Sequence, residues 1–368
     1  MPILEPGTLI KDTYEVERFL GEGAFAEVYR VKHRFLGRQS LKIFKRVGMS
    51  IEEIHDVLGE ALLLTRIGHP NIVRVFDANV LETESGTCGY FTMEFVAGGS
   101  LRRFWQTHGI NLVPIATSLS LIKQVCEGLA VAHQSDPPIV HRDIKPDNIL
   151  VGHEAEGLRA RVSDFGLAKN VNPLTLLATT AGTIAFKPPE AFSAKQGDSR
   201  ASDVWAIGAT LYMLLTDKLP FADALSTSIT HHEQPVYRKL IPPSQVNPDV
   251  SVQLDEIVAT ALHWDPKTRY QSAQELLTCL NDLRDARPNL NSPTRKSIDH
   301  HQSKVALGSY TEPDEAGAKV LAERALNHGK KGDFHEAADL MEEAFLKYPP
   351  LRTQFEDRVK LWRRGIAM

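Results

Sequence analysis

Residues 140–150 of this chain read VHRDIKPDNIL, and the tripeptide Asp-Phe-Gly follows at residues 164–166. An aspartate beside a Ser, Thr or Tyr hydroxyl can orient that hydroxyl and accept its proton, and a lysine two residues on can reach a phosphoryl group in transfer. Asp143 and Lys145 fit these two roles. The stretch therefore predicts a site for phosphoryl transfer.

Two further residues of these motifs, Asn148 and Asp164, carry oxygen atoms suited to Mg²⁺. This ion prefers a few carboxylate or carbonyl oxygens together with nucleotide phosphates. Either residue alone would mean little, since an isolated Asp-Phe-Gly is more often a turn. Their order after Asp143 favours transfer from a nucleotide.

With these motifs the chain resembles the eukaryotic-type (Hanks-type) protein Ser/Thr kinases, from about Tyr14 to about Arg287. The resemblance implies an α+β, two-lobed protein kinase fold, with a small β-rich N-lobe and a mainly α C-lobe, and it implies ATP and Mg²⁺ as cofactors. The implied catalytic residues are Asp143, Lys145, Asn148, Asp164, Lys42 and Glu60. The expected segments are a lead-in at 1–13, the N-lobe at 14–94, the C-lobe at 95–287, a linker at 288–315 and a short tetratricopeptide-repeat-like helical segment at 316–368.

The composition is that of a globular protein, with 24% charged and 42% hydrophobic residues among the 368. The net charge of −4 gives no sign of a nucleic-acid or membrane surface, so we expect neither partner. Three scattered cysteines predict no disulfide framework and no metal cluster. We find no signal peptide and no apolar run of about 18 residues, and we expect a cytoplasmic protein.

Hydrophobic periodicity divides the chain into a β-rich first third and a helical remainder. Alternating patterns predict strands at 14–20, 26–31 and 40–44, and a capping box of Ser50 with Glu53 predicts a helix that runs to Thr65. Helical periods predict four later helices, at 119–133, 202–215, 252–262 and 272–283.

A glycine-rich turn lies between the first two predicted strands, where glycines let backbone N–H groups approach phosphates. A strand rather than a helix follows it, which favours a kinase flap over a dinucleotide-binding fold. Ala26 stands where the family usually has its third glycine. The resemblance implies nucleotide contacts by Gly21, Glu22, Gly23, Ala24, Phe25, Val28, Ser40, Lys42, Met93, Glu94 and Val96.

In the family, the lysine at the position of Lys42 holds the α- and β-phosphates and pairs with a helix carboxylate, here Glu60. Met93 is expected to guard the back of the adenine pocket. The backbones of Glu94 and Val96 are expected to bind the base. Ser40 replaces the usual alanine of the pocket wall.

The resemblance also implies roles in the activation segment, which runs from beyond Asp164 to Glu190, and in the catalytic loop around Asp143. Glu190 is expected to pair with Arg269, and Asp203 is expected to brace the catalytic loop. Arg142, assisted by Lys169, is expected to bind a phosphate on this segment. Thr179 is the first candidate acceptor of that phosphate and Thr180 the second, while Thr183 is expected to shape the substrate site and to favour Ser or Thr.

Residues 318–351 resemble one tetratricopeptide repeat, with the turn at Gly332–Ala337 and with Ala344 and Pro349 at the expected later places. One helical hairpin cannot bury its apolar face alone. We therefore expect it to dock on the kinase lobe, to pair with another copy or to bind a protein partner, with 355–366 as a closing helix. A plain helical extension is the alternative.

Three functions are compared. The first is an active protein Ser/Thr kinase that phosphorylates proteins, including its own activation segment. The second is a pseudokinase scaffold whose helical tail recruits partners, although only Ala26, Ser40 and Pro188 depart from the family pattern and none is a catalytic group. The third is a small-molecule phosphotransferase, which the full activation segment disfavours because that segment forms a platform for peptides.

Overall fold

The computed structural model describes residues 2–23, 26–45, 58–59, 67–83, 86–108, 112–165, 185–192, 199–221, 240–283 and 314–366. The chain divides into two compact units. The small unit comprises Met1–Val96 and Ser163–Lys169, and the large unit comprises Ala97–Val162 and Asn170–Met368.

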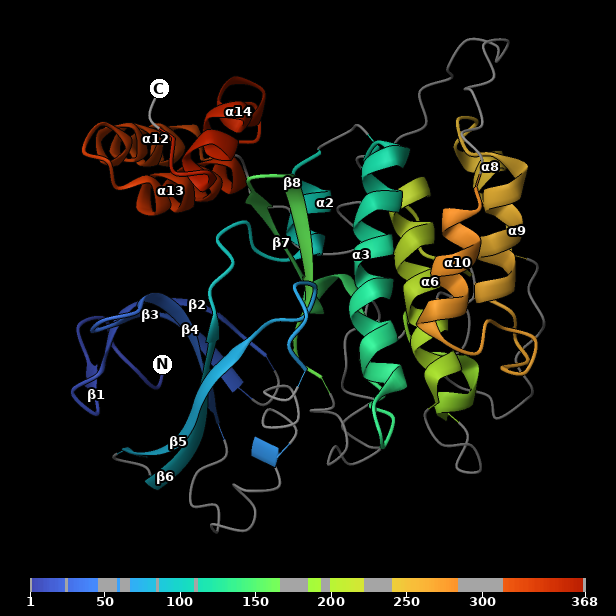
Figure 1. Cartoon of the computed structure of the whole chain (residues 1–368), viewed down its shortest axis with the longest axis horizontal. Coiled ribbons are helices and arrows are strands. Elements are labelled where there is room, and N and C mark those ends of the chain that lie inside the picture. Colours follow the sequence, from blue (N-terminus) through green and yellow to red (C-terminus); the bar gives the residue numbers. More distant parts are fainter. Residues whose placement is uncertain are drawn as a thin grey trace. The chain divides into compact units, whose positions relative to one another are not determined.

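The small unit is built on one antiparallel sheet with the strand order β1-β2-β3-β4-β6-β5 (Figure 1). The strands are β1 (Leu9–Ile10), β2 (Tyr14–Glu22), β3 (Ala26–His33), β4 (Gly37–Phe44), β5 (Val75–Thr83) and β6 (Gly86–Glu94). The three strands predicted from alternation are confirmed and extend by a few residues at their ends. Of the helix predicted from Ser50 to Thr65, only Leu58 and Gly59 are described, and both are helical.

One face of this sheet carries a core of apolar side chains that includes Val16, Tyr29 and Leu41. The segment before β1, predicted as a lead-in, contributes Leu4 to the same core. The backbone N–H of Leu4 donates to the Tyr29 hydroxyl at 3.0 Å, and that of Ile3 donates to a Glu27 carboxylate oxygen at 2.8 Å. The N-terminal segment is therefore tied to β3, the strand that follows the glycine-rich turn.

The large unit is mainly helical, with one short antiparallel hairpin. The elements of its lobe are α2 (Leu101–Gln106), α3 (Ile115–Gln134), η1 (Pro146–Asn148), β7 (Ile149–Glu154), β8 (Gly157–Val162), η2 (Pro189–Phe192), α6 (Arg200–Thr216), α8 (Pro243–Val246), α9 (Val252–Ala261) and α10 (Ala273–Asn281). The four predicted helices correspond to α3, α6, α9 and α10. The start of α3 lies earlier than predicted, directly after Pro114, a residue type that a helix interior does not accommodate.

Helix α6 forms the centre of this lobe. From Ala201 to Thr216 every residue is buried, which is the pattern of a helix covered on all sides. Its N-terminus is closed by a capping box between Ser199 and Ser202. At its C-terminus, Asp217 adopts a left-handed conformation (φ 57°) and accepts a 2.6 Å hydrogen bond from the Trp105 indole of α2.

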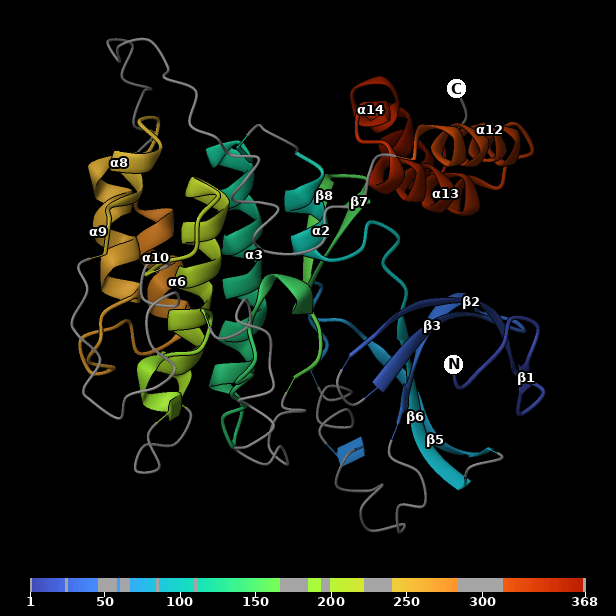
Figure 2. The same ribbon diagram turned by 180° about the vertical axis from the view of Figure 1, so that it is seen from behind.

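Helix α3 is long and apolar enough to cross a membrane by length and composition, contrary to the expectation that the chain holds no such run. It lies between the β7–β8 hairpin and α6, as Figure 2 shows from behind, and it also contacts α10. Half of its apolar window is buried inside the protein. Its hydrophobic composition is therefore explained by its place in the core of the lobe.

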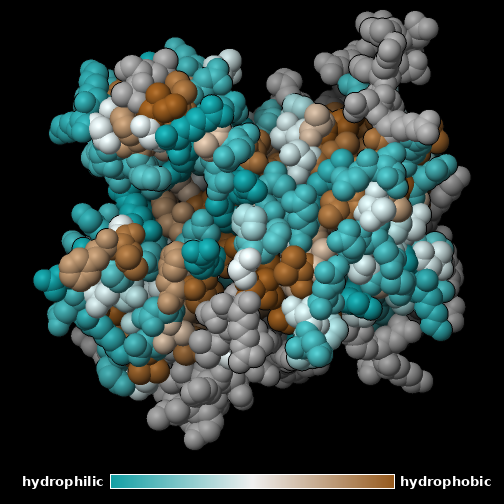
Figure 3. Space-filling view, viewed as in Figure 1, coloured by the Kyte–Doolittle hydropathy of each residue, from teal (hydrophilic) through white to brown (hydrophobic). Residues whose placement is uncertain are grey.

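The C-terminal residues form three helices, α12 (Glu315–Lys330), α13 (Phe334–Lys347) and α14 (Leu351–Arg363), which we call the tail. Gly332, in the turn between the first two, has a φ of +82°, a conformation that glycine adopts without strain. All three helices supply side chains to one apolar core that includes Ala325, Phe345 and Trp362. The face of the tail seen in Figure 3 is mainly hydrophilic, with a smaller apolar area.

Candidate active site

Lys42 lies in the middle of the small unit's sheet, where β4 pairs with Val28 of β3 and with Phe91 of β6. Its side chain is largely buried, and Nζ lies 2.7 Å from Oδ1 of Asp164. A buried ammonium requires a partner to offset the loss of its hydration. The contact therefore fixes a lysine and a carboxylate next to each other in one unit.

The backbone at Asp164 has a φ of +60°, which is uncommon for a residue other than glycine. The next side chain, Phe165, is buried with 2% of its surface exposed. An anchored aromatic ring beside an unusual backbone angle holds the aspartate in a defined orientation. Such conformations cluster at functional sites, where the surrounding structure maintains them.

The strands that flank the glycine-rich turn are in register up to its edge, with Gly21 opposite Val28 and Glu22 opposite Glu27. The N–H of Gly23 donates to the carbonyl of Ala26 at 2.8 Å. The turn is thus a hairpin between β2 and β3, as expected for a flap over phosphates.

Strand β6, the last strand of this sheet in chain order, ends at the residues expected to bind the base. Met93 of β6 pairs with Ser40 of β4, and both side chains are buried. The N–H of Glu94 donates to the carbonyl of Arg74 at 2.9 Å, which assigns any contact between Glu94 and a base to its carbonyl group. Val96, at the end of the small unit's first segment, is also buried.

In the large unit, several donors converge on the carboxylate of Asp143. Lys145 Nζ lies 2.7 Å from Oδ2, and Lys187 Nζ lies 3.0 Å from Oδ1. The Nδ2 of Asn148 donates to the same Oδ2 at 2.9 Å and to the Asp143 carbonyl at 2.8 Å. Because Nδ2 is held in this way, the orientation of the Asn148 amide, and so the position of its oxygen, is fixed.

The electrostatics keep this carboxylate ionised. Burial raises the pKa of Asp143, but the ammonium groups of Lys145 and Lys187 outweigh burial and leave the pKa below its ordinary value. An ionised carboxylate is an acceptor only. Asp143 can therefore orient a hydroxyl group and accept its proton at neutral pH.

Asp203 holds the backbone of the catalytic loop, as predicted. One of its carboxylate oxygens accepts from the N–H of His141 at 2.8 Å and contacts Nε2 of His133 at 2.9 Å, and the other accepts from the N–H of Arg142 at 2.8 Å. Arg142 itself has a φ of +70°. The backbone of the loop thus reaches Asp143 through a turn that the buried carboxylate of Asp203 maintains.

The predicted pair of Glu190 and Arg269 is confirmed. Two parallel hydrogen bonds of 2.6 and 2.7 Å join the guanidinium to the carboxylate, and both side chains are almost fully buried. The guanidinium also stacks on the Trp205 ring at 4.8 Å. This bidentate pair links the end of the activation segment to the helical lobe.

The protein kinase domain family matches residues 14–279. The chain belongs to this family. The β-rich small unit and the helical large unit correspond to the two lobes of the protein kinase fold. The serine/threonine-protein kinase PknB of Mycobacterium leprae is 32% identical over 284 residues, covering 76% of this chain and 44% of the relative.

Two further kinases support the assignment. A probable serine/threonine-protein kinase of Clostridium perfringens is 31% identical and covers 84% of this chain and 43% of that protein. The crystal structure of the Mycobacterium tuberculosis PknI kinase domain is 25% identical, with a TM-score of 0.57, and covers 76% of this chain and 98% of its own. The chain thus spans less than half the length of the curated relatives named here.

Part of the predicted kinase site lies outside the described residues: Ala24, Phe25, Glu60, Lys169, Thr179, Thr180 and Thr183. The pairing of Lys42 with Glu60 stays a prediction. One contact that the sequence did not predict is that of Lys187 with Asp143. The only signal for it was a basic residue directly before Pro188.

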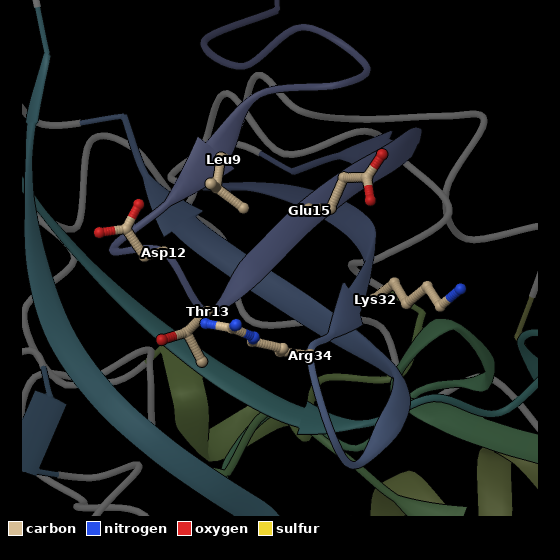
Figure 4. Close-up of a pocket in the computed structure, with 6 residues that line it drawn as sticks. All are labelled: Leu9, Asp12, Thr13, Glu15, Lys32 and Arg34. Carbon is tan, nitrogen blue, oxygen red and sulfur yellow. The ribbon is translucent and has the colours of Figure 1, made fainter.

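No kinase residue named above lines the hollow shown in Figure 4, which is open to solvent. It lies on β1, on the adjoining turn and on the ends of β2 and β3 away from the glycine-rich turn. Its lining residues are Leu9, Asp12, Thr13, Glu15, Lys32 and Arg34. The hollow is therefore separate from the nucleotide contacts expected in this unit.

Among the described residues, no three His, Cys, Asp or Glu side chains cluster as metal ligands. The expected Mg²⁺ ligands are the amide of Asn148 and the carboxylate of Asp164. Two such residues do not form a cluster of three His, Cys, Asp or Glu side chains. The two residues fit the ion by chemistry, because amide and carboxylate oxygens together with phosphates are ligands that Mg²⁺ accepts.

Proposed function

We propose that this chain is an ATP-dependent protein Ser/Thr kinase that transfers the γ-phosphoryl group to hydroxyls of proteins. The observation that carries the proposal is the Asp143 carboxylate, held ionised by Lys145 and Lys187 and joined to Asn148. The names of its relatives, Ser/Thr kinases over 76% to 84% of this chain, support the same activity.

Each catalytic residue has a distinct task in this proposal. Asp143 orients the acceptor hydroxyl and takes its proton, and Lys145 offsets negative charge on the transferred group. Lys42 holds nucleotide phosphates, and its contact with Asp164 supports this role because it keeps a cation beside the carboxylate proposed to bind the metal ion. The ammonium of Lys187 contacts the Asp143 carboxylate and donates to the Arg142 carbonyl at 2.8 Å. It thereby holds the Asp143 side chain next to the backbone of the catalytic loop.

Mg²⁺ would be held by Asn148 and Asp164, and when bound it supplies positive charge that neutralises the phosphates. The nucleotide would lie against the glycine-rich turn and the pocket residues of the small unit. Met93 and Ser40, which are paired on neighbouring strands, would form part of that pocket wall. Glu94 and Val96 would contact the base through their backbones.

Regulation by phosphorylation is part of the proposal. Thr179 or Thr180 would accept a phosphate from the kinase itself, and Arg142 with Lys169 would bind it, because a phosphate pairs strongly with a guanidinium. Thr183 would contact the substrate site and favour Ser or Thr. This part rests on the family resemblance, since of these residues only Arg142 is described.

The organisation of the whole chain is part of the same proposal. The kinase lobes would run over 14–94 and 95–287, the linker over 288–315 and the tail over 316–368. The hairpin of α12 and α13, with Gly332 at its turn, supports a tetratricopeptide-repeat-like tail that binds a protein partner or a second copy. We place the protein in the cytoplasm.

The test is transfer from labelled ATP with Mg²⁺ to the protein itself and to a generic basic protein, compared with an Asp143→Asn variant. A kinase transfers label to protein, and the variant loses nearly all transfer. Equal labelling of parent and variant would support the pseudokinase alternative, in which the label comes from a contaminant. Labelling of a metabolite but of no protein would support a small-molecule phosphotransferase.

A further inference from the structure

The tail is a small folded body with its own core. Among the described residues, the buried apolar side chains of that core all come from α12, α13 and α14. Its contacts with the lobe are therefore of a different kind. They are ion pairs, hydrogen bonds and single side-chain contacts that reach β7, α2 and residues 98 and 99 near the start of the large unit.

One group of these contacts surrounds His153, near the end of β7. Glu342 of α13, with 1% of its side chain exposed, accepts from the His153 N–H at 3.1 Å and lies 3.5 Å from its Nδ1. Arg363 of α14 donates to the His153 carbonyl at 2.9 Å and to Glu342 and Asp339 at 2.7 Å each. The tail thus holds both backbone groups of one residue of β7.

Burial raises the pKa of Glu342, but hydrogen bonding to His153 and the charge of Arg363 outweigh burial and leave the pKa lowered. The carboxylate is therefore ionised at neutral pH. A buried ion pair that loses one partner leaves an uncompensated charge. The cluster is consequently sensitive to any change of Glu342 or Arg363.

The same carboxylate lies against the first residues of the large unit. A Cβ on Gly98 would lie 3.0 Å from Oε2 of Glu342, and one on Gly99 would lie 3.5 Å from the Leu346 side chain. The Gly99 carbonyl accepts from the N–H of Val151 at 2.8 Å. The tail, residues 98–99 and β7 are thus in mutual contact.

A second route leads from the tail to the catalytic loop through α2. The guanidinium of Arg352 in α14 lies 4.9 Å from the centre of the Phe104 ring in α2. On the same helix, Arg102 makes two hydrogen bonds of 2.7 and 2.9 Å to Asp147. Asp147 precedes Asn148, and β7 begins at the residue after Asn148.

We propose that the docked tail positions the catalytic loop, with Glu342 and Arg363 as positioning residues for phosphoryl transfer. The first route ends in β7, which begins directly after Asn148, and the second ends at Asp147, directly before it. The Nδ2 of Asn148 in turn holds the carboxylate of Asp143. A loosened β7 would let Asn148 and Asp143 move relative to each other, and small displacements of reacting groups are costly. The inference rests on the kinase activity proposed above.

The experiment uses the full chain and three variants. Arg363→Glu places a carboxylate opposite Glu342, Asp339 and the His153 carbonyl, and so undocks the tail. Arg358→Glu is the matched control, because it makes the same change on the same helix at a residue that stacks on Phe355 of its own helix. Glu342→Gln is a milder, isosteric change within the cluster.

Three quantities are measured for each variant: kcat, KM for ATP, and amide hydrogen exchange over residues 97–104 and 149–154. For Arg363→Glu we expect faster exchange in both segments and a kcat lower by about tenfold, with KM for ATP within about twofold of the parent. Arg358→Glu should match the parent. A loss of fold alone would instead reduce the active fraction without this selective exchange.

Faster exchange with an unchanged kcat would overturn the proposal, since β7 would then be loose without effect on catalysis. Unchanged exchange would equally contradict it, because these side chains would then not hold the strand. If Arg363→Glu does not fold, Glu342→Gln is judged by the same criteria. If the parent itself transfers no phosphoryl group, the proposed function fails, whereas a change confined to the variants concerns the tail.

Discussion

Replacement of Glu190 by Gln tests the energetic value of the ion pair that anchors the activation segment. Arg269 is fully buried and Glu190 is 5% exposed in its side chain. The guanidinium also donates to the carbonyls of Ala201, His263 and Trp264, so it cannot leave its site when the carboxylate is lost. Glu190→Gln therefore leaves a buried, poorly compensated cation.

Breaking such a pair costs about 3–5 kcal/mol, and in a lobe of this size each kcal/mol lowers Tm by about 2–4 °C. We expect Glu190→Gln to lower the Tm of the large unit by about 10 °C in calorimetry at pH 7. The matched control is Glu315→Gln, which removes the exposed partner of Lys319 and should cost less than about 0.5 kcal/mol. If Glu190→Gln lowered Tm no more than this control, the assignment of a structural role to the buried pair would be refuted.

Three further predictions concern the catalytic loop. Lys187→Met removes a cation beside Asp143 and should lower kcat by about tenfold with KM for ATP nearly unchanged; steady-state kinetics that show a parental kcat would contradict this. Asp203→Asn replaces one carboxylate oxygen by an amide N–H₂ group, although the side chain faces three donors, and should cost about 1–3 kcal/mol of stability in thermal unfolding. A parental Tm would argue against the bracing role. The pKa of Asp143 is lowered in the folded state, so this carboxylate contributes stability above its ordinary pKa of about 4 that is lost as pH falls through the folded value. The loss of Tm caused by Asp143→Asn should therefore be smaller at about pH 3 than at about pH 6. An equal loss of Tm at both pH values would count against a lowered pKa.

The parts of the fold that the sequence predicts are those set by local signals. The helical periodicity of residues 252–262 and 272–283 predicts α9 and α10 to within about two residues. The pair of Glu190 and Arg269, which lies far apart along the chain, was predicted only through the family resemblance. Its hydrogen bonds now give a physical reason for the spacing of the two motifs.

The parts that the sequence did not predict depend on contacts between distant segments. Lys187 reaches Asp143 because the end of the activation segment lies over the catalytic loop, a placement that no local pattern encodes. Glu342 was one of many charged residues on an amphipathic helix, and 189 residues separate it from His153. Helix α14 starts at Leu351 rather than at residue 355, directly after Pro350, a residue type that a helix interior does not accommodate.

Phosphosite mapping by mass spectrometry after incubation with Mg²⁺ and ATP, beside an Asp143→Asn control, tests the central claim most directly. The claim is that Asp143 orients a protein hydroxyl for phosphoryl transfer. The account predicts phosphate on Ser or Thr residues of the parent, including Thr179 or Thr180, and almost none on the variant. Equal phosphorylation of parent and variant, or none on the parent with a generic protein substrate also left unmodified, would contradict it.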